Sequence, residues 1–258
     1  MLLPNPPEYF GFWGDRNTAN FDEHLNSEKE KEKVKKKKLL IMSVLVSVVS
    51  PFLSAQNLSS STFSNELSKQ DLYGGAITMH MSDYTDVSNV RVVPDHQEVW
   101  TDGDDNTIII ELLNLKEETT TDDAAAFFFN DLAEASEASS AELLHAGLLE
   151  HLICPEISSN VEICGAVGRH IVSKFRDEDK SGEKARNHVM VYLINLRLRE
   201  HGTDMLITMY RTVKVGEKSS TTELKEVDES DDQEFPGLRV FTSMLGTLKI
   251  VDKSLFGE

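Results

Sequence analysis

The fold of this chain is indicated most clearly by the stretch RVVPDHQEVW, residues 91–100. Its Pro94-Asp95 pair is typical of a turn, and residues 97–101 then begin a strand. The sequence DGDDN at 102–106 has the composition of a hairpin loop. Residues 107–115 predict a second strand, because the three isoleucines in it favour extended backbone. The sequence therefore predicts an antiparallel hairpin at this point.

The two predicted strands carry the carboxylates Glu98 and Glu111. If the strands pair, we expect the two side chains to lie near each other on the sheet. Paired carboxylates can carry out acid–base chemistry or form an acidic patch for a basic partner. More often they belong to a solvated face, and composition alone does not choose between these interpretations.

Upstream of the hairpin, residues 73–79 predict a first strand. The glycines Gly74 and Gly75 permit a bend in it that other residues do not make. Further along, Asp86 is expected to cap a short helical turn at 86–90.

Downstream of the hairpin, the apolar spacing becomes that of helices. The Asp122-Asp123 pair is expected to cap a helix at 122–135. A second helix is predicted at 140–152, where Leu144 and Leu148 share one face. Acidic residues near both starts suit the helix dipole.

Three strands are predicted to follow, at 161–175, 186–198 and 203–215. In the first, Gly165 and Gly168 are expected to mark bulges or bends. The second contains a continuous apolar stretch, which is typical of a central strand covered on both faces. The short link between the last two strands implies antiparallel pairing.

The C-terminal part is predicted to begin with a long mobile loop at 216–234, because this segment is polar and acidic. Pro236 then opens a helix that extends to about residue 250, with apolar residues spaced three and four apart. The tail that follows is expected to pack back on the domain through Val251, Leu255 and Phe256. The order of elements predicts an α+β fold, a largely antiparallel sheet flanked by helices.

The charge of the chain is strongly negative, with a formal net charge of -18 at pH 7. Residues 1–70 carry nine Lys/Arg and eight Asp/Glu, so residues 71–258 carry 17 basic and 36 acidic side chains, a net charge of -19. An acidic surface repels phosphate backbones, which argues against nucleic acid as a partner, and attracts basic protein surfaces. It also serves solubility, so acidity by itself does not identify a partner.

The chain is expected to divide into an extension, residues 1–70, and one domain, residues 71–258. The extension is predicted to be disordered, with a basic run ending at Lys38 and a short apolar segment at 39–55. These features resemble a signal peptide, but a membrane span needs about 20 apolar residues, so no stable span is expected. A targeting segment, a start-site artefact and a mobile amphipathic arm all fit this extension.

The sequence contains no nucleophile elbow, phosphate loop, dinucleotide fingerprint or zinc-protease helix motif. It therefore predicts no catalytic residues, no cofactor and no metal site. The nearest approach to a metal-binding set has spacings that do not match a structural zinc site; its members are His145, His151, Cys154 and Cys164. We expect both cysteines to be reduced thiols, since a domain of this size does not need a disulfide.

Four stretches taken together give a further indication, namely LYGGAIT at 72–78, the residues from Asp86 to Val99, IIIELL at 108–113 and VDKSLFG at 251–257. In this order, and with Thr203-Asp204 at the start of the last predicted strand, they resemble the Mog family of Ran guanine nucleotide release factors. The resemblance covers residues 71–258 and is weakest over residues 116–180.

The family is known for binding the small GTPase Ran, promoting loss of its bound nucleotide and supporting nuclear protein import. The resemblance implies a regulator without catalytic residues of its own, a monomer found in nucleus and cytoplasm. It also implies a fold similar to that of the photosystem protein PsbP, an α/β/α sandwich. Carried over by motif, the Ran surface is expected to include the charged residues Asp86, Arg91, Asp95, Glu98 and Glu111. Asn114 stands where the family often has an acidic residue, so this chain departs from the family there.

Three other functions fit parts of the sequence. The apolar segment 39–55 fits a PsbP-like plastid or exported protein. The carboxylate pair fits a small-molecule enzyme, if a ligand-sized apolar pocket surrounds Glu98 and Glu111. A scaffold that binds Ran without affecting its nucleotide fits the same acidic residues as a release factor does.

Overall fold

The computed structural model describes residues 67–88, 90, 92–102, 106–173, 182–219 and 234–257. The predictions made for the apolar segment 39–55 and for most of the loop at 216–234 lie outside these residues. They stay predictions, as does the division of the chain at residue 70. None of the helices in the described residues is long and apolar enough to cross a membrane.

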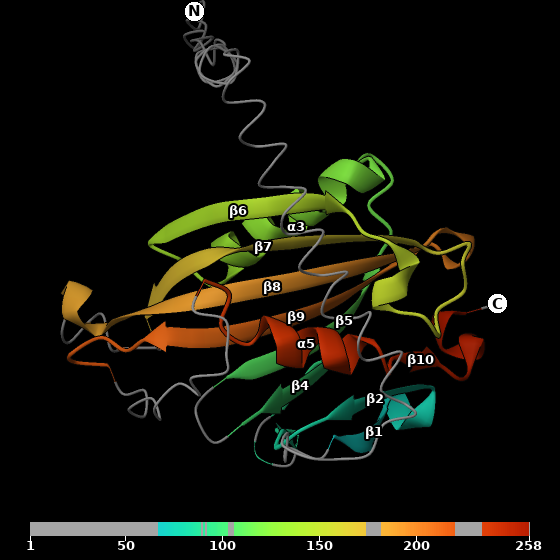
Figure 1. Ribbon diagram of the computed structural model, residues 1–258, viewed down its shortest axis with the longest axis horizontal. Coiled ribbons are helices and arrows are strands. Elements are labelled where there is room, and N and C mark those ends of the chain that lie inside the picture. The colour runs from blue at the N-terminus through green and yellow to red at the C-terminus, as the bar shows by residue number, and fades with distance from the viewer. Residues whose placement is uncertain are drawn as a thin grey trace, which may run out of the picture. The chain divides into compact units, whose positions relative to one another are not determined.

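The described residues form two antiparallel sheets and two α-helices (Figure 1). The main sheet has the strand order β3-β4-β5-β9-β8-β7-β6. Its strands are β3 (Thr85–Asp86), β4 (Gln97–Thr101), β5 (Thr107–Asn114), β6 (Ser140–Leu148), β7 (Glu162–Ser173), β8 (Arg186–Leu198) and β9 (Thr203–Lys214). The small sheet, in the order β1-β2-β10, has the strands β1 (Ser68–Leu72), β2 (Ile77–Met81) and β10 (Lys249–Ile250). The α-helices are α3 (Thr121–Ala135) and α5 (Leu238–Leu245), and the short 3₁₀ helices are η1 (Tyr73–Gly75), η2 (His151–Ile153), η3 (Gly182–Ala185), η4 (Arg199–His201) and η5 (Lys253–Phe256).

The two α-helices cover opposite faces of the main sheet (Figure 1). Side chains alternate along β8, so that Val191 and Leu193 pack under α3 while Tyr192 faces α5. The Tyr192 ring lies 6.0 Å from that of Phe241, and its hydroxyl donates to Pro236 O at 2.8 Å. The expected α+β class, a largely antiparallel sheet flanked by helices, is confirmed. The predicted hairpin β4–β5 and the central strand β8 are confirmed as well.

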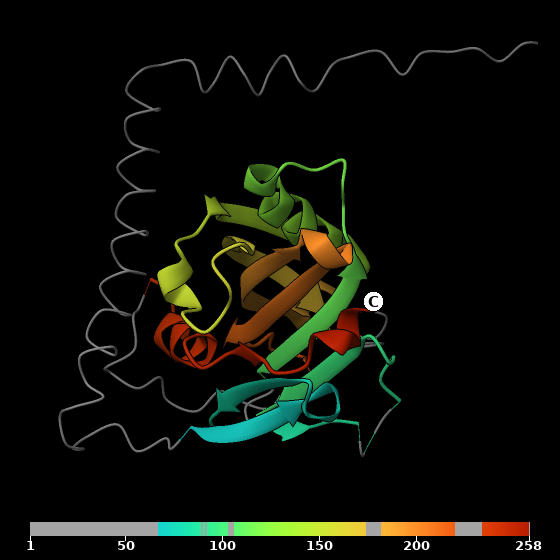
Figure 2. The ribbon, with the colours of Figure 1, turned by 90° about the vertical axis from the view of Figure 1, so that its right-hand side faces the viewer.

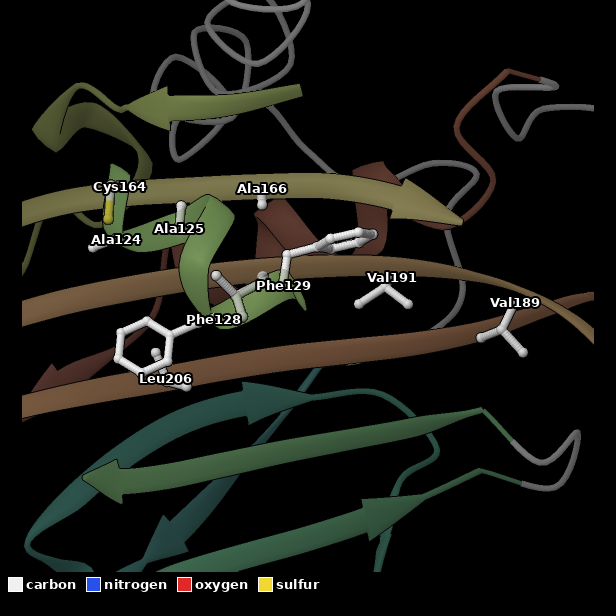
Figure 3. Packing of buried hydrophobic residues seen from close by; sticks show 10 residues of the cluster. Ala124, Ala125, Phe128, Phe129, Cys164, Ala166, Val189, Val191 and Leu206 are labelled. Atoms are coloured by element: carbon white, nitrogen blue, oxygen red, sulfur yellow. The ribbon is translucent and has the colours of Figure 1, made fainter. Parts of the chain in front are cut away.

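The core under α3 is built from two aromatic side chains of the helix and small side chains of the strands. Phe128 and Phe129 extend from α3 among residues of β7, β8 and β9 (Figure 3). Phe129 lies directly against Gly168 of β7, where a Cβ atom would collide with the phenyl ring and with the carbonyl oxygen of Glu142. Glycine at position 168 therefore lets the helix approach the sheet.

Of the two glycines predicted to mark bulges or bends, Gly168 stands opposite Leu143, where the β6–β7 register shifts, whereas Gly165 lies in regular pairing. The strand β7 pairs with β8 over its whole length without a register shift. The bulge lies in the neighbouring strand β6, between Leu143 and His145. The glycines make room for close packing, because a Cβ at Gly165 would also collide with its neighbours.

The helix predicted at 140–152 is wrong, because residues Ser140–Leu148 form the edge strand β6. This strand pairs with β7, from Ser140 opposite Ile171 to Leu148 opposite Cys164. The spacing of Leu144 and Leu148 does fit a helix. However, ordinary helix propensities differ by only about 0.7 kcal/mol per residue, and pairing with an exposed sheet edge outweighs such a preference.

The single strand predicted at 73–79 is replaced by two strands joined at η1. Tyr73, Gly74 and Gly75 have φ angles of 49°, 66° and 92°, and this left-handed run reverses the chain between β1 and β2. The short turn predicted after Asp86 is present, and Asp86 caps it, because its Oδ1 accepts from Ser88 N–H. Asp86 ends β3, and the chain then makes a turn closed by a hydrogen bond from Val90 N–H to Val87 O at 3.0 Å.

The structure corrects the predicted cap of α3 and the predicted end of α5. The helix α3 is capped by Thr120, whose hydroxyl accepts from Asp123 N–H, and not by the Asp122-Asp123 pair. The helix predicted from Pro236 to about residue 250 ends at Leu245, and β10 then pairs with β2.

The tail after β10 packs back on the domain as predicted, but not through all three of its apolar residues. The Phe256 ring lies 5.5 Å from that of His201 in η4, and Leu255 is half-buried. Val251 is 65% exposed, so its predicted packing is wrong. Its backbone N–H is nevertheless bound by Ala76 O at 2.8 Å.

His170 is expected to make the stability of the domain depend on pH. Its side chain is fully buried 4.6 Å from the Phe129 ring, and neither ring nitrogen has a hydrogen-bond partner within the described structure. Burial lowers the pKa of His170, because the charged imidazole loses its hydration there. The folded state therefore favours the neutral ring. The contribution of His170 to the stability of the domain is fully present above the ordinary histidine pKa of about 6.5. It is lost as the pH falls through the lowered pKa of the folded state.

Urea unfolding at about pH 7.5 and about pH 5.5 measures this effect. The wild type is expected to lose more stability between the two conditions than His170→Leu, in which the titrating group is gone. The comparison cancels the contributions of carboxylates such as Glu98 and Glu111, which are common to both proteins. Equal losses in the two proteins would show that His170 does not carry the pH dependence.

Candidate functional site

Glu98 is held against the turn η1 by a backbone hydrogen bond. Its Oε1 accepts from Tyr73 N–H at 2.7 Å, although the two residues are 25 positions apart in the sequence. Burial raises the pKa of Glu98 above its ordinary value, the hydrogen bond from Tyr73 lowers it, and the negative charge of Asp86 raises it further. Glu98 is thus a partly desolvated carboxylate with a fixed orientation.

Tyr73 also fixes the strands on which the candidate site is built. Its hydroxyl lies 3.0 Å from His96 O and 2.9 Å from Ile110 O, and its one proton is shared between these two carbonyl oxygens. Three of the four family-like stretches, 72–78, 86–99 and 108–113, therefore meet at the side chain of Tyr73. Sequence analysis did not select Tyr73, because its partners lie on separate strands and only pairing of those strands brings them together.

The expectation that Glu98 and Glu111 lie near each other on the sheet is wrong. The strands β4 and β5 do pair, but Glu98 stands opposite Ile110 and Glu111 stands opposite Gln97. Successive residues of a strand point to opposite faces, so the two carboxylates lie on opposite faces. Glu111 accepts from Gln97 Nε2 at 2.5 Å, and burial raises its pKa. The two groups do not form an acid–base pair.

Glu98 lies at an open edge of the main sheet. The outer strand β3 pairs with Trp100 and Thr101 of β4, and Val87 N–H donates to Val99 O, so this pairing ends before the half-buried residues Gln97 and Glu98. Asp86 stands opposite Trp100 and therefore shares the face of Glu98.

The segment that leads from β3 to β4 carries the other predicted charges. Asp86 is ordered by Ser88, whose N–H donates to Oδ1 at 2.8 Å and whose hydroxyl donates to Oδ2 at 2.5 Å. Asp95 is exposed in the turn before β4, where Gln97 N–H donates to Pro94 O at 2.9 Å. Arg91, the fifth predicted residue, lies outside the described part of the chain.

The same segment exposes two apolar side chains, Val90 at 82% and Val92 at 98% of their surface. Exposed apolar residues rimmed by polar groups are typical of a protein contact site. The combination favours a protein-binding surface over a merely solvated acidic face.

Other chemistry is not gathered around these carboxylates. Within the described residues, no group of three or more His, Cys, Asp or Glu side chains is placed to hold a metal ion. Cys154 and Cys164 are buried free thiols, and burial raises the pKa of each to about 12. A cavity of about 150 Å³ lies between the loop at 156–161, the β8–β9 turn and the C-terminal tail, and neither Glu98 nor Glu111 lines it.

Asp204, which is part of the family-like Thr203-Asp204 pair, has a structural place in the interior. Its Oδ1 accepts from Arg197 Nε at 3.0 Å and from Asn195 Nδ2 at 3.2 Å. Its Oδ2 accepts from Lys116 N–H at 2.7 Å, and Arg197 also donates to Thr119 O at 2.7 Å. This buried network ties the segment before α3 to the β8–β9 hairpin.

Comparison with known proteins identifies close counterparts of this domain. A family model described as Ran-interacting Mog1 protein matches residues 70–212. The chain is 28% identical over 198 residues to the probable Ran guanine nucleotide release factor of Dictyostelium discoideum, covering 75% of this chain and 98% of that protein. It is 31% identical over 193 residues to the Ran guanine nucleotide release factor of Danio rerio, covering 72% and 98%. The crystal structure of the Saccharomyces cerevisiae Ran-binding protein Mog1p has the same fold, with a TM-score of 0.50 at 22% identity, over 75% of this chain and 100% of that one.

Proposed function

Because the chain belongs to the family of Ran-interacting Mog1 proteins, we propose that it binds the small GTPase Ran and promotes release of its guanine nucleotide. The observation that carries this proposal is the match to two relatives named as release factors over 98% of their length. In this role the protein supports nuclear protein import, acts as a monomer in nucleus and cytoplasm, and regulates a GTPase without catalytic residues of its own. The strongly negative charge of the domain fits a basic protein partner and argues against nucleic acid.

We place the Ran-binding surface at the open edge of β4. Glu98 is its centre, with Asp86 on the same face and Asp95 in the exposed turn before the strand. Arg91 belongs to the proposed surface by its place in the motif. Glu111 belongs to the proposed surface by its place in the motif, although it lies on β5 and on the opposite face of the sheet from Glu98.

The proposed mechanism follows from thermodynamic linkage. A partner that binds nucleotide-poor Ran more tightly than nucleotide-bound Ran weakens nucleotide binding by the same factor. GTPases hold their nucleotide through a lysine and a Mg²⁺ ion that contact the phosphates. A partly desolvated carboxylate such as Glu98 competes for one of these cations, because an ion pair is stronger away from water.

Glu98→Gln is expected to abolish most of the release activity. The amide keeps the shape of the side chain and an oxygen that can accept from Tyr73 N–H, but it removes the charge. Loss of one partner of a buried charge pair costs about 2 kcal/mol or more, so release should slow by about thirtyfold or more. The measurement is the fluorescence decay of Ran loaded with a fluorescent guanine nucleotide, in the presence of the full chain and excess unlabelled nucleotide.

Glu142→Gln is the matched control. It makes the same change of charge at an exposed position on β6, at the other edge of the main sheet, and should leave release unchanged. Unchanged release by Glu98→Gln would overturn the assigned site. Binding of the wild type to Ran without faster nucleotide loss would leave a Ran-binding scaffold in place of a release factor.

A further inference from the structure

We propose that Tyr73 is a positioning residue that holds Glu98 in the orientation required for nucleotide release. This inference rests on the proposed function, since it assigns a second residue to the same site. The residue lies in the stretch 72–78, next to Gly74 and Gly75, and neither the charge pattern nor the proposed mechanism gives this stretch a role.

Tyr73 connects Glu98 of β4 to the backbone of His96 and of Ile110 in β5. Its backbone N–H binds the carboxylate of Glu98, while its hydroxyl binds the carbonyl oxygens of His96 and Ile110. The hydroxyl bonds anchor the ring to β5 and to the residue that precedes β4. The backbone N–H is thereby presented to the carboxylate of β4 from a fixed point.

Tyr73 has an unusual backbone conformation. Its φ of 49° lies in the left-handed region, which residues with a large side chain rarely adopt. Such a conformation persists only where the surroundings hold it, and it is concentrated at functional sites. Because the hydroxyl fixes the ring, rotation of φ to an ordinary value would turn the N–H away from Glu98. The strained angle and the hydrogen bond therefore depend on each other.

The turn that contains Tyr73 is also held by the C-terminal segment. Ala76 O accepts from Val251 N–H at 2.8 Å and from Asp252 N–H at 3.0 Å, next to the pairing of β10 with β2. Figure 2 shows this C-terminal segment, in red, close to the turn, in cyan. The family-like stretch 251–257 thus binds the turn η1 through Ala76, and this turn binds Glu98 through Tyr73. All four family-like stretches are therefore linked by hydrogen bonds.

The effect on Glu98 is to keep it charged and oriented. Burial alone favours the neutral acid, which attracts a cation poorly, whereas a hydrogen bond from an N–H group favours the carboxylate. One oxygen is committed to Tyr73, so the carboxylate does not need to be ordered again when the partner arrives. Such preorganisation strengthens binding without any new contact to the partner.

The test is a double-mutant cycle in the full chain, with the fluorescent-nucleotide assay on Ran. Tyr73→Phe keeps the ring and removes both hydroxyl hydrogen bonds, and it is expected to slow release about fivefold or more. In the Glu98→Gln background the same substitution should cause no further slowing. A merely structural loss would instead add to the effect of Glu98→Gln. Gly75→Ala, which strains the turn at a φ of 92° without a steric collision, offers a second route to the same result if Tyr73→Phe does not fold.

Tyr192→Phe is the matched control, because it also removes a tyrosine hydrogen bond to a backbone carbonyl, at Pro236. It should leave release unchanged. If Glu98→Gln slows release but Tyr73→Phe behaves like Tyr192→Phe, the role of Tyr73 is refuted and the proposed function stands. If Glu98→Gln itself has no effect, the proposed site fails first and this inference fails with it.

Discussion

Replacing Asp204 with alanine is expected to lower the free energy of unfolding by about 3–5 kcal/mol. The side chains of Asp204 and Arg197 are both fully buried, with Oδ1 and Nε 3.0 Å apart. Without the carboxylate, the guanidinium remains in the interior without its counter-charge. Lys116 N–H also loses its acceptor, so the segment that leads into α3 loses a contact with β9. Urea unfolding of the wild type and the variant measures the difference.

The exposed ion pair between Arg169 and Glu142 provides the control for Asp204. These side chains lie 3.3 Å apart at 45% and 60% exposure, so water screens their attraction. Glu142→Ala should therefore change stability by about 1 kcal/mol or less. A comparably small effect of Asp204→Ala would mean that the buried network is dispensable.

Replacing Phe129 with alanine is expected to cost about 3–5 kcal/mol of unfolding free energy. The ring is fully buried between α3 and β7 and contacts both Gly168 and His170. Its removal leaves a cavity that the glycine opposite cannot fill, because position 168 has no side chain. Thermal or urea unfolding reports the loss. Entry of water beside His170 should also weaken the pH dependence of stability that is specific to that residue.

Phe127, two residues away on the same helix, is the control for Phe129. It is 38% exposed and packs beneath Lys116, whose Nζ lies 5.4 Å from the ring centroid. Phe127→Ala makes the same chemical change at the surface and should cost about 1 kcal/mol. Equal losses at the two positions would contradict the assignment of Phe129 to the core.

Several features of the fold were predictable because local chemistry specifies them. The Pro94-Asp95 turn, the strand after it and the isoleucine-rich strand 107–114 were predicted in the right place. The apolar run of β8 was correctly assigned to a central strand, and the helix at α3 was placed within one residue of its start. Turn residues and apolar periodicity act over a few positions, so a single sequence displays them.

The edge strand β6 shows where such signals end. Leu144 and Leu148 have helical spacing, yet their segment pairs with β7, which lies about twenty residues further along the chain. The geometry of the candidate site likewise depends on how one strand pairs with another. The sequence indicated the charged residues and the family to which the chain belongs, but it did not indicate that Glu98 and Glu111 face opposite ways, because the register of the hairpin decides that.

The sequence by itself thus determined the Pro94-Asp95 turn, the strands β4, β5 and β8, the helix α3, the acidic character of the domain and its family. Only the tertiary structure decided that β6 is a strand, that Asp204 is buried beside Arg197, and that Tyr73 binds Glu98. Each of these depends on a partner brought close by sheet pairing, and no pattern within a short stretch of sequence records that partner. The hydrogen bond between Tyr73 and Glu98, which spans 25 positions, exists only once both sheets have formed.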